Sequence, residues 1–107
     1  MRRGDLISVA LVRDYGKRRP AIIVQSDEFQ HLDSVTVMPL TSDRLKQEVF
    51  RVPLEPSDEN GLQQKSQVMI DKVATLPRAK TGTFIGRVSD EDMALVDRAL
   101  AAFLGFA

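Results

Sequence analysis

The chain has 107 residues and a mass of 11.9 kDa, and 43% of its residues are hydrophobic. This is the size of one domain with its own core, so we expect residues 1–107 to form a single domain. Lysine and arginine together number 15, as do aspartate and glutamate, so the formal net charge is zero and any site for a polyanion must be local. The absence of cysteine and the presence of a single histidine, His31, exclude thiolate nucleophiles, disulfides and His-rich zinc sites. What remains is the chemistry of carboxylate, arginine, lysine and hydroxyl groups.

Five short segments rich in valine and isoleucine predict the strands of a small antiparallel sheet. Each segment is bounded by Gly, Pro, Asp or Ser, and the intervening stretches are too short for crossover helices. Pro20 is expected at the first residue of a strand, and Pro39 and Pro53 at strand ends, edges or bulges. We predict an α+β fold, in which a bent antiparallel sheet of SH3-like barrel type precedes a C-terminal helix. The predicted strands are residues 6–11, 21–25, 34–38, 48–54 and 67–70.

Residues 89–105 carry the pattern of one amphipathic helix. Ser89 is expected to cap the helix, acidic residues follow in the first turn, and Gly105 supplies a stop. Because apolar residues recur at helical spacing, we expect this helix to lie flat against the sheet and to bury Phe103 and Leu104. Residues 76–83 are expected to be a connector with at most one helical turn. The apolar stripe of the helix comprises Met93, Leu95, Val96, Ala99, Leu100, Ala102 and Phe103.

No apolar run near the start of the chain is long enough to span a bilayer. The first residues, Met1 to Asp5, lead into a polar-punctuated strand and not into the apolar region of a secretory signal. We therefore expect a cytoplasmic protein that has no membrane partner.

Charge is distributed unevenly along the chain. Residues 1–20 have a formal charge of +4, and residues 89–107 have a formal charge of −3. Such segments complement each other in a dimer, form one cationic groove, or are simply solvated surface. The densest basic cluster is Lys17-Arg18-Arg19, which follows Gly16 and precedes an apolar strand. Because the following proline restricts Arg19 to extended geometry, its guanidinium is suited to gripping a phosphate with two parallel hydrogen bonds; the alternative is an ordinary basic turn.

The order and spacing of several motifs resemble the MazF/PemK family of toxin endoribonucleases from type II toxin–antitoxin systems. The motifs are R-R-G-D-L-I-S-V, then G-K-R-R-P-A-I-I-V-Q-S-D, and then V-T-V-M-P-L-T-S. The resemblance continues through S-Q-V-M-I-D-K-V-A-T-L to the terminal S-D-E-D-M-A-L-V-D-R-A-L-A-A-F-L-G, so it covers nearly the whole chain. It implies a metal-independent, sequence-specific cut in single-stranded RNA that uses no cofactor. The substrate's own 2′-hydroxyl attacks the adjacent phosphate and leaves a 2′,3′-cyclic phosphate and a 5′-hydroxyl, and the cut inhibits translation and growth.

The resemblance also implies which residues act and what they bind. Arg19 matches the catalytic arginine, which stabilises the phosphorane and helps to move a proton, and Thr41 matches the catalytic threonine, whose hydroxyl donates to a nonbridging oxygen. The family further implies a homodimer, and an antitoxin whose disordered acidic and apolar tail occupies the RNA groove. We predict RNA contacts at Arg3, Lys17, Arg18, Gln25, Ser26, Asp27, Ser42 and Lys72.

Four of these positions and one loop have a second interpretation or depart from the family pattern. Gln25, Ser26 and Asp27 either contact bases or make a turn. Lys72 stands where many members have an RNA-contacting glutamine, which suggests a phosphate contact instead. The loop at residues 12–18 is shorter than in many members and lacks the glutamate that some carry ahead of the arginine.

An alternative function is available on the same fold. Val24-Gln25-Ser26-Asp27 and Val37-Met38-Pro39-Leu40 are similar to segments of CcdB, a family of toxins that poison DNA gyrase. The chain ends in Leu104-Gly105-Phe106-Ala107, without the Trp-Gly-Ile ending of that family, and Arg19-Pro20 matches the nuclease pattern. A third class, a binding protein with an inactive site, is disfavoured because both Arg19 and Thr41 are present.

Overall fold

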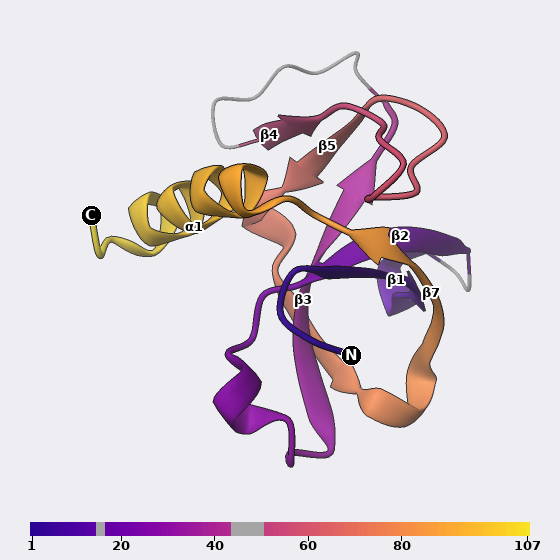
Figure 1. Cartoon of the computed structure of the whole chain (residues 1–107). Helices are drawn as coiled ribbons and strands as arrows, with labels where there is room; N and C mark the ends of the chain where they lie inside the picture. Colours follow the sequence, from indigo (N-terminus) through magenta and orange to yellow (C-terminus); the bar gives the residue numbers. More distant parts are fainter. Residues whose placement is uncertain (15–16, 44–50) are drawn as a thin grey trace.

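The computed structural model describes residues 1–14, 17–43 and 51–107 of the chain. In these residues, seven strands form an antiparallel sheet in the order β4-β5-β3-β2-β1-β7, with β6 paired to β3 (Figure 1). One α-helix, α1, follows the last strand. This architecture confirms the predicted fold class. The strands are β1 (Asp5–Ala10), β2 (Arg18–Ile23), β3 (Ser34–Thr41), β4 (Arg51–Leu54), β5 (Ser66–Met69), β6 (Ala74–Pro77) and β7 (Thr81–Arg87), and the helix α1 is Asp90–Leu104.

The sheet bends because β3 has different partners along its length. The first half of β3 pairs with β6, from Ser34 to Val37, and its end pairs with β5, at Leu40 and Thr41. The short 3-10 helix η3 (Ile70–Lys72) connects these two partners. At the other side of the sheet, the pairing of β1 with β7 contains register shifts around Ile7. Irregularities of this kind increase twist and curvature.

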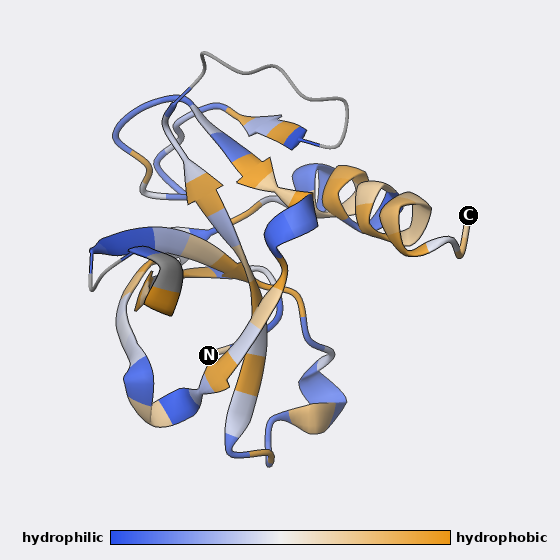
Figure 2. Cartoon of the chain, turned by 180° about the vertical axis from the view of Figure 1, so that it is seen from behind, coloured by the Kyte–Doolittle hydropathy of each residue, from blue (hydrophilic) through white to orange (hydrophobic). Residues whose placement is uncertain are grey.

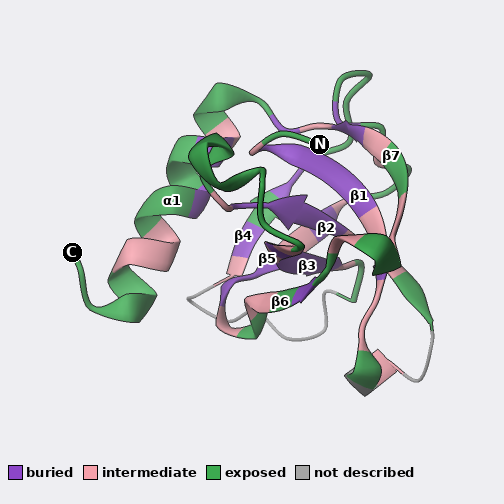
Figure 3. Cartoon of the chain, turned by 90° about the horizontal axis from the view of Figure 1, so that it is seen from below, coloured by how far each residue is buried: buried purple, intermediate pink, exposed green. Residues whose placement is uncertain are grey.

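The bent sheet buries side chains on both of its faces. One cluster lies between the sheet and α1 and includes Leu6, Ile22, Met38 and Val96. A second cluster lies on the opposite face and includes Ile7, Ala21 and Val37. Figure 3 shows most of β1 and the second half of β2 as buried, whereas most of α1 is exposed. Burial on both faces explains why the buried stretches at residues 6–7 of β1 and 21–23 of β2 are continuously apolar.

Two strands were missed by the sequence prediction. The predicted connector, residues 76–83, does contain one helical turn, η4 (Arg78–Lys80), but β6 precedes this turn and β7 follows it. Neither strand alternates regularly between buried and exposed residues, and β7 contains Gly82 and Gly86, which are usually read as breakers. Tertiary pairing with β3 and β1 therefore creates these strands.

The predicted positions of three prolines are partly correct. Pro20 is the third residue of β2 and not the first, because pairing of β2 with β1 extends the strand back to Arg18. Pro39 lies within β3, opposite Ala21. Pro53 lies in the edge strand β4, as predicted. Of the predicted strand 48–54, residues 48–50 lie outside the described residues, as do Tyr15 and Gly16 of the basic motif.

The helix begins and ends as predicted but does not lie flat on the sheet. Ser89 accepts a hydrogen bond from the backbone N–H of Asp92, and Gly105 ends the helix with a positive φ of 86°. Its N-terminal half packs on β4 and η3 through Met93 and Val96.

The expectation for the last turn of α1 is wrong, although Ala99 and Leu100 before it still pack against the core. Phe103 is 48% exposed and Leu104 is 49% exposed, and Leu95 in the N-terminal half is exposed as well. In Figures 1 and 2 this end of α1 projects beyond the sheet, and Figure 2 shows its apolar colouring. The physical reason is that β4 and η3 are only four and three residues long, so the apolar surface beneath the helix ends before its last turns.

Candidate active site

Antiparallel pairing brings Arg19 beside Thr41. In the register between β2 and β3, Ala21 pairs with Pro39 and Ile23 with Val37. Continued for two residues, the same register places Arg19 opposite Thr41. A direct contact fixes this end of the sheet, because Arg19 Nη1 donates a hydrogen bond to the carbonyl oxygen of Leu40 at 3.2 Å. The two residues that the family resemblance designates as catalytic are therefore neighbours on the adjacent strands β2 and β3.

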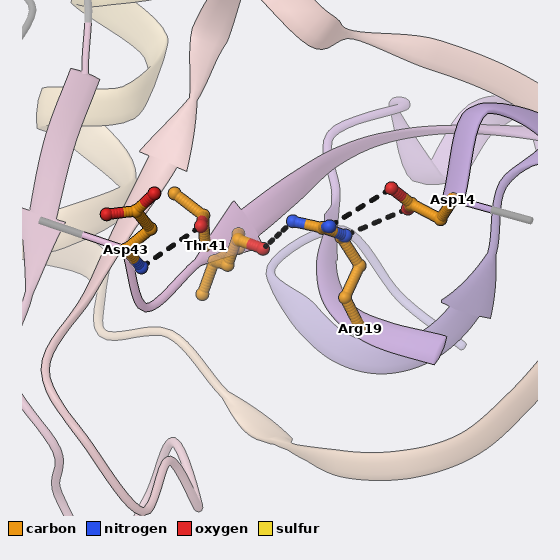
Figure 4. A network of polar contacts seen from close by, with 5 residues as sticks. Asp14, Arg19, Thr41 and Asp43 are labelled. Atoms are coloured by element: carbon orange, nitrogen blue, oxygen red, sulfur yellow. Dashed lines mark hydrogen bonds and ion pairs between the residues drawn. The ribbon is translucent and has the colours of Figure 1, made fainter. Parts of the chain in front are cut away.

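The guanidinium of Arg19 is oriented by the carboxylate of Asp14. Arg19 Nε lies 2.8 Å from Asp14 Oδ2, and Arg19 Nη2 lies 3.0 Å from Asp14 Oδ1 (Figure 4). Asp14 ends the short 3-10 helix η1 (Val12–Asp14), and its side chain is only 8% exposed. Two parallel hydrogen bonds between charged groups fix the plane of a guanidinium. Arg19 is thus held on one edge by Asp14 and on another by β3.

Thr41 has its hydroxyl oriented by the backbone that follows β3. The backbone N–H of Asp43 donates to Thr41 Oγ1 at 3.1 Å (Figure 4). A hydroxyl has one hydrogen to donate and two lone pairs to accept with. This contact uses one lone pair, so the hydroxyl hydrogen of Thr41 stays available for a phosphate oxygen.

An open cleft of about 620 Å³ lies where Arg19 and Thr41 meet; we call it the Arg19 cleft. Lys17 and Arg18 line it together with Arg19, against one carboxylate, that of Asp43. A second group of lining residues is apolar and includes Leu62 and Ile85. The third group is polar and uncharged, and consists of Thr41, Ser42, Gln63, Gln64 and Ser66. Cations beside apolar and amide groups suit a ligand that has both phosphates and bases.

The predicted RNA-contacting residues fall into separate regions. Lys17, Arg18 and Ser42 line the Arg19 cleft with Arg19 and Thr41. Gln25, Ser26 and Asp27 follow the other end of β2, about 20 Å along the strand direction from Arg19. Lys72 lies in η3, where its ammonium is 3.2 Å from Asp71 Oδ2. These four residues and Arg3 do not line the cleft.

The region after β2 forms a turn that is tied to the N-terminus. Gln25 Oε1 accepts from the backbone N–H of Thr36, and Ser26 caps the 3-10 helix η2 (Asp27–Phe29) by accepting from Glu28. The carboxylate of Asp27 accepts from the backbone N–H of Arg3 at 2.7 Å. This bond and one from the side chain of Gln30 hold the pKa of Asp27 below its ordinary value of 3.8. The described contacts at these three residues are those of a turn.

Arg3 connects this turn to α1, so it links the basic N-terminal segment with the acidic C-terminal segment. Its guanidinium donates to the carbonyl oxygen of Val24 and forms an ion pair with Asp97 of α1. Part of the basic segment and part of the acidic helix therefore neutralise each other within one chain.

Sequence reasoning missed three features around the cleft. Asp14 was counted only as a charge, although a carboxylate close ahead of Arg19 in a short connection is a usable signal for an ion pair. Gln67 pairs with Thr41 between β5 and β3, and its Oε1 is buried without a hydrogen-bond partner in the described part of the chain. The loop that presents Gln63 and Gln64 had no motif to mark it.

None of the helices among the described residues combines the length and hydropathy that crossing a bilayer requires.

Comparison with known proteins identifies the family. Residues 2–104 match the family described as PemK-like, MazF-like toxin of type II toxin-antitoxin system. A probable endoribonuclease MazF of Mycolicibacterium smegmatis is 44% identical over 108 residues, which cover 100% of this chain and 99% of that protein. Endoribonuclease MazF9 of Mycobacterium tuberculosis is 30% identical over 114 residues, covering 97% of this chain and 96% of that protein.

Solved structures give the same result. An endoribonuclease from a mycobacterial species, in complex with its cognate antitoxin, superposes with a TM-score of 0.85 at 27% identity, covering 100% of this chain and 97% of that one. The Mycobacterium tuberculosis toxin MazF-mt6 superposes with a TM-score of 0.82 at 26% identity, covering 96% of this chain and 98% of that one. The chain belongs to the MazF/PemK family of toxin endoribonucleases of type II toxin–antitoxin systems.

Proposed function

We propose that this protein is a metal-independent, sequence-specific endoribonuclease that cuts single-stranded RNA in the cytoplasm and thereby inhibits translation and growth. The observation that carries the proposal is the Arg19 cleft, in which an oriented guanidinium and an oriented hydroxyl lie side by side beside two further cations. Its volume of about 620 Å³ is in the range of ligand pockets and leaves room for a nucleotide.

In the proposed reaction the nucleophile belongs to the substrate. The 2′-oxygen of one nucleotide bonds to its 3′ phosphorus, and the bond from this phosphorus to the 5′-oxygen of the next nucleotide breaks. The 2′-hydroxyl loses its proton and the 5′-oxygen gains one, so the products are a 2′,3′-cyclic phosphate and a 5′-hydroxyl. The enzyme must stabilise negative charge on the nonbridging oxygens and assist these proton movements.

The contacts of Arg19 and Thr41 support these roles. A guanidinium has five N–H donors, and the described contacts to Asp14 and Leu40 use three of them. Two remain for the nonbridging oxygens, which is the number that a bidentate phosphate contact needs. The free hydroxyl hydrogen of Thr41 supplies a further donor. We assign charge stabilisation to Arg19 first and proton movement second, since a guanidinium stays protonated in proteins.

We further propose that two copies form a homodimer and that an antitoxin inhibits it. The exposed apolar side chains of α1, at Leu95, Phe103 and Leu104, and of Phe106 just after it support an intermolecular contact, because monomers rarely expose extended apolar patches. In a dimer the two basic segments would line one cationic channel for RNA. A disordered antitoxin tail with acidic and apolar residues would match the cationic and apolar groups of the Arg19 cleft. Sedimentation should give twice the chain mass of 11.9 kDa, and a monomer mass would contradict the dimer.

The test of the proposed function is cleavage of a long unstructured RNA in excess EDTA, followed by mapping of the new 5′ ends. Arg19→Ala is compared with Arg78→Ala, because Arg78 also donates to backbone carbonyls but lies outside the cleft. We expect discrete 5′-hydroxyl ends from the unmutated protein and from Arg78→Ala. Folded Arg19→Ala, checked by circular dichroism, should be slower by at least about a hundredfold. RNA that stays whole in EDTA but is cut with added magnesium would refute metal independence.

A further inference from the structure

The loop before β5 is braced by a buried asparagine. Asn60 is only 4% exposed. Its Oδ1 accepts from the backbone N–H groups of Ser57 and Leu62 at 3.0 and 2.9 Å, and its Nδ2 donates to the carbonyl oxygen of Glu55 at 2.8 Å. The backbone N–H of Asn60 in turn donates to Ser57 Oγ at 3.0 Å. A single side chain thus fixes the path of residues 55–62.

Two glycines hold the same loop directly against β7. Gly61 has a positive φ of 68°, and a Cβ added there would lie 2.3 Å from the carbonyl oxygen of Ile85. A Cβ on Gly86 would lie 2.3 Å from the carbonyl group of Asn60. Such backbone contact excludes other residues at both positions and leaves the loop little freedom to move. The loop is therefore a rigid support and not a loose connection.

This support ends in two glutamines that line the Arg19 cleft. Gln63 and Gln64 are both exposed, and within the described part of the chain neither side-chain amide has a hydrogen-bond partner. Gln67, three residues after Gln64, pairs with Thr41. The Cα atom of Gln64 consequently lies within about 16 Å of that of Thr41, given the spacing between and along strands. A nucleotide that is bound at Arg19 and Thr41 has its neighbour within reach of these amides.

We propose that Gln63 and Gln64 read the base of a nucleotide that flanks the scissile phosphate; this inference rests on the proposed function. The cationic residues of the cleft bind phosphates, which carry no sequence information. An uncharged amide adds little to phosphate binding, but it presents a donor and an acceptor side by side. This pair distinguishes amino from keto edges of bases, which single-stranded RNA exposes. Leu62 and Ile85 supply apolar surface for the face of the same base.

The test compares cleavage-site maps and relative kcat/KM values on a set of RNAs that differ by one base around the cut. The Gln63→Met/Gln64→Met double variant keeps side-chain length and removes the amide donors and acceptors. Gln30→Ala is the control, since Gln30 is an exposed glutamine outside the Arg19 cleft. We expect the double variant to lose discrimination at one position next to the cut by about ten- to a hundredfold. Its salt dependence should equal that of the unmutated protein, because no phosphate contact changes.

Each other result overturns the inference in a distinguishable way. If the unmutated protein cuts and the double variant keeps the same preferences, Gln63 and Gln64 do not read a base. If the double variant slows equally on all sequences and its salt dependence changes, the amides act on the backbone instead. If the unmutated protein cuts no RNA, the proposed function fails and the inference fails with it.

Discussion

Asp14→Asn should lower the cleavage rate although Asp14 does not line the cleft. The substitution keeps the size of the side chain and removes the charge that pairs with Arg19 at 2.8 and 3.0 Å. An asparagine has one acceptor oxygen, so at most one of the two parallel hydrogen bonds survives in good geometry. The guanidinium keeps its contact to Leu40 but loses its fixed plane. Asp14 is therefore a positioning residue for Arg19.

The magnitude follows from what orientation contributes to catalysis. A displacement of about 1 Å at a reacting group costs up to about a hundredfold in rate. We expect kcat to fall by about ten- to a hundredfold, equivalent to about 1.4–2.7 kcal/mol of transition-state stabilisation. KM should stay the same or fall, because the removed carboxylate repels RNA. The assay is single-turnover cleavage at saturating enzyme, with KM from steady-state measurements on the same RNA.

The control for Asp14→Asn is Asp97→Asn, which breaks another Asp–Arg ion pair, with Arg3, away from the cleft. It should leave kcat unchanged. Asp14→Glu should restore part of the lost rate, because it returns the carboxylate. An unchanged kcat in folded Asp14→Asn, or a loss that appears only in KM, would refute the positioning role.

Three further predictions follow from other contacts. Thr41→Val should reduce cleavage by at least about a hundredfold, whereas Thr41→Ser, which keeps the hydroxyl, should stay within about tenfold; equal activity of the two variants would contradict a donor role for Thr41. Val96→Ala should lower the free energy of unfolding in urea by about 2 kcal/mol, since the side chain of Val96 is fully buried between α1 and the sheet, and a loss below about 0.5 kcal/mol would contradict this packing. Asp27 should titrate by NMR with a midpoint below 3.8; because its pKa is lowered by folding, its contribution to stability is present above the unfolded pKa and is lost as the pH falls through the folded pKa. A midpoint at or above 3.8 would mean that the bond from Arg3 to Asp27 is absent in solution.

The sequence predicted the elements whose signals are local. Valine-rich and isoleucine-rich segments became strands, and Ser89 and Gly105 became the caps of α1. The extent of helix packing is not local, since it depends on how far β4 and η3 reach beneath α1. Phe103 was therefore predicted as buried although it is half exposed. Similarly, β7 forms because β1 pairs with it, although its two glycines are residues that usually argue against a strand.

The candidate site likewise combines residues that have local sequence signals with contacts that depend on the tertiary structure. Arg19 was marked by its position before Pro20, and Thr41 by the family resemblance. Their proximity follows from the register of β2 and β3, which the sequence pattern does not give. Asp14 and the loop at Asn60 act by tertiary approach, through an ion pair and through backbone contact with β7. The position of Asp14 five residues before Arg19 is a local signal for the ion pair, whereas no local pattern marks the loop at Asn60.

The measurement that tests the central claim most directly uses an RNA that contains a single 2′-deoxynucleotide on the 5′ side of the mapped scissile phosphate. If the substrate's own 2′-hydroxyl is the nucleophile, this RNA binds with unchanged affinity and is not cut at that phosphate. The matching all-RNA substrate should give a 2′,3′-cyclic phosphate by mass spectrometry. Cleavage of the deoxy-substituted site at a comparable rate would show that a water molecule or a protein group attacks the phosphate, and would contradict the mechanism proposed for Arg19 and Thr41.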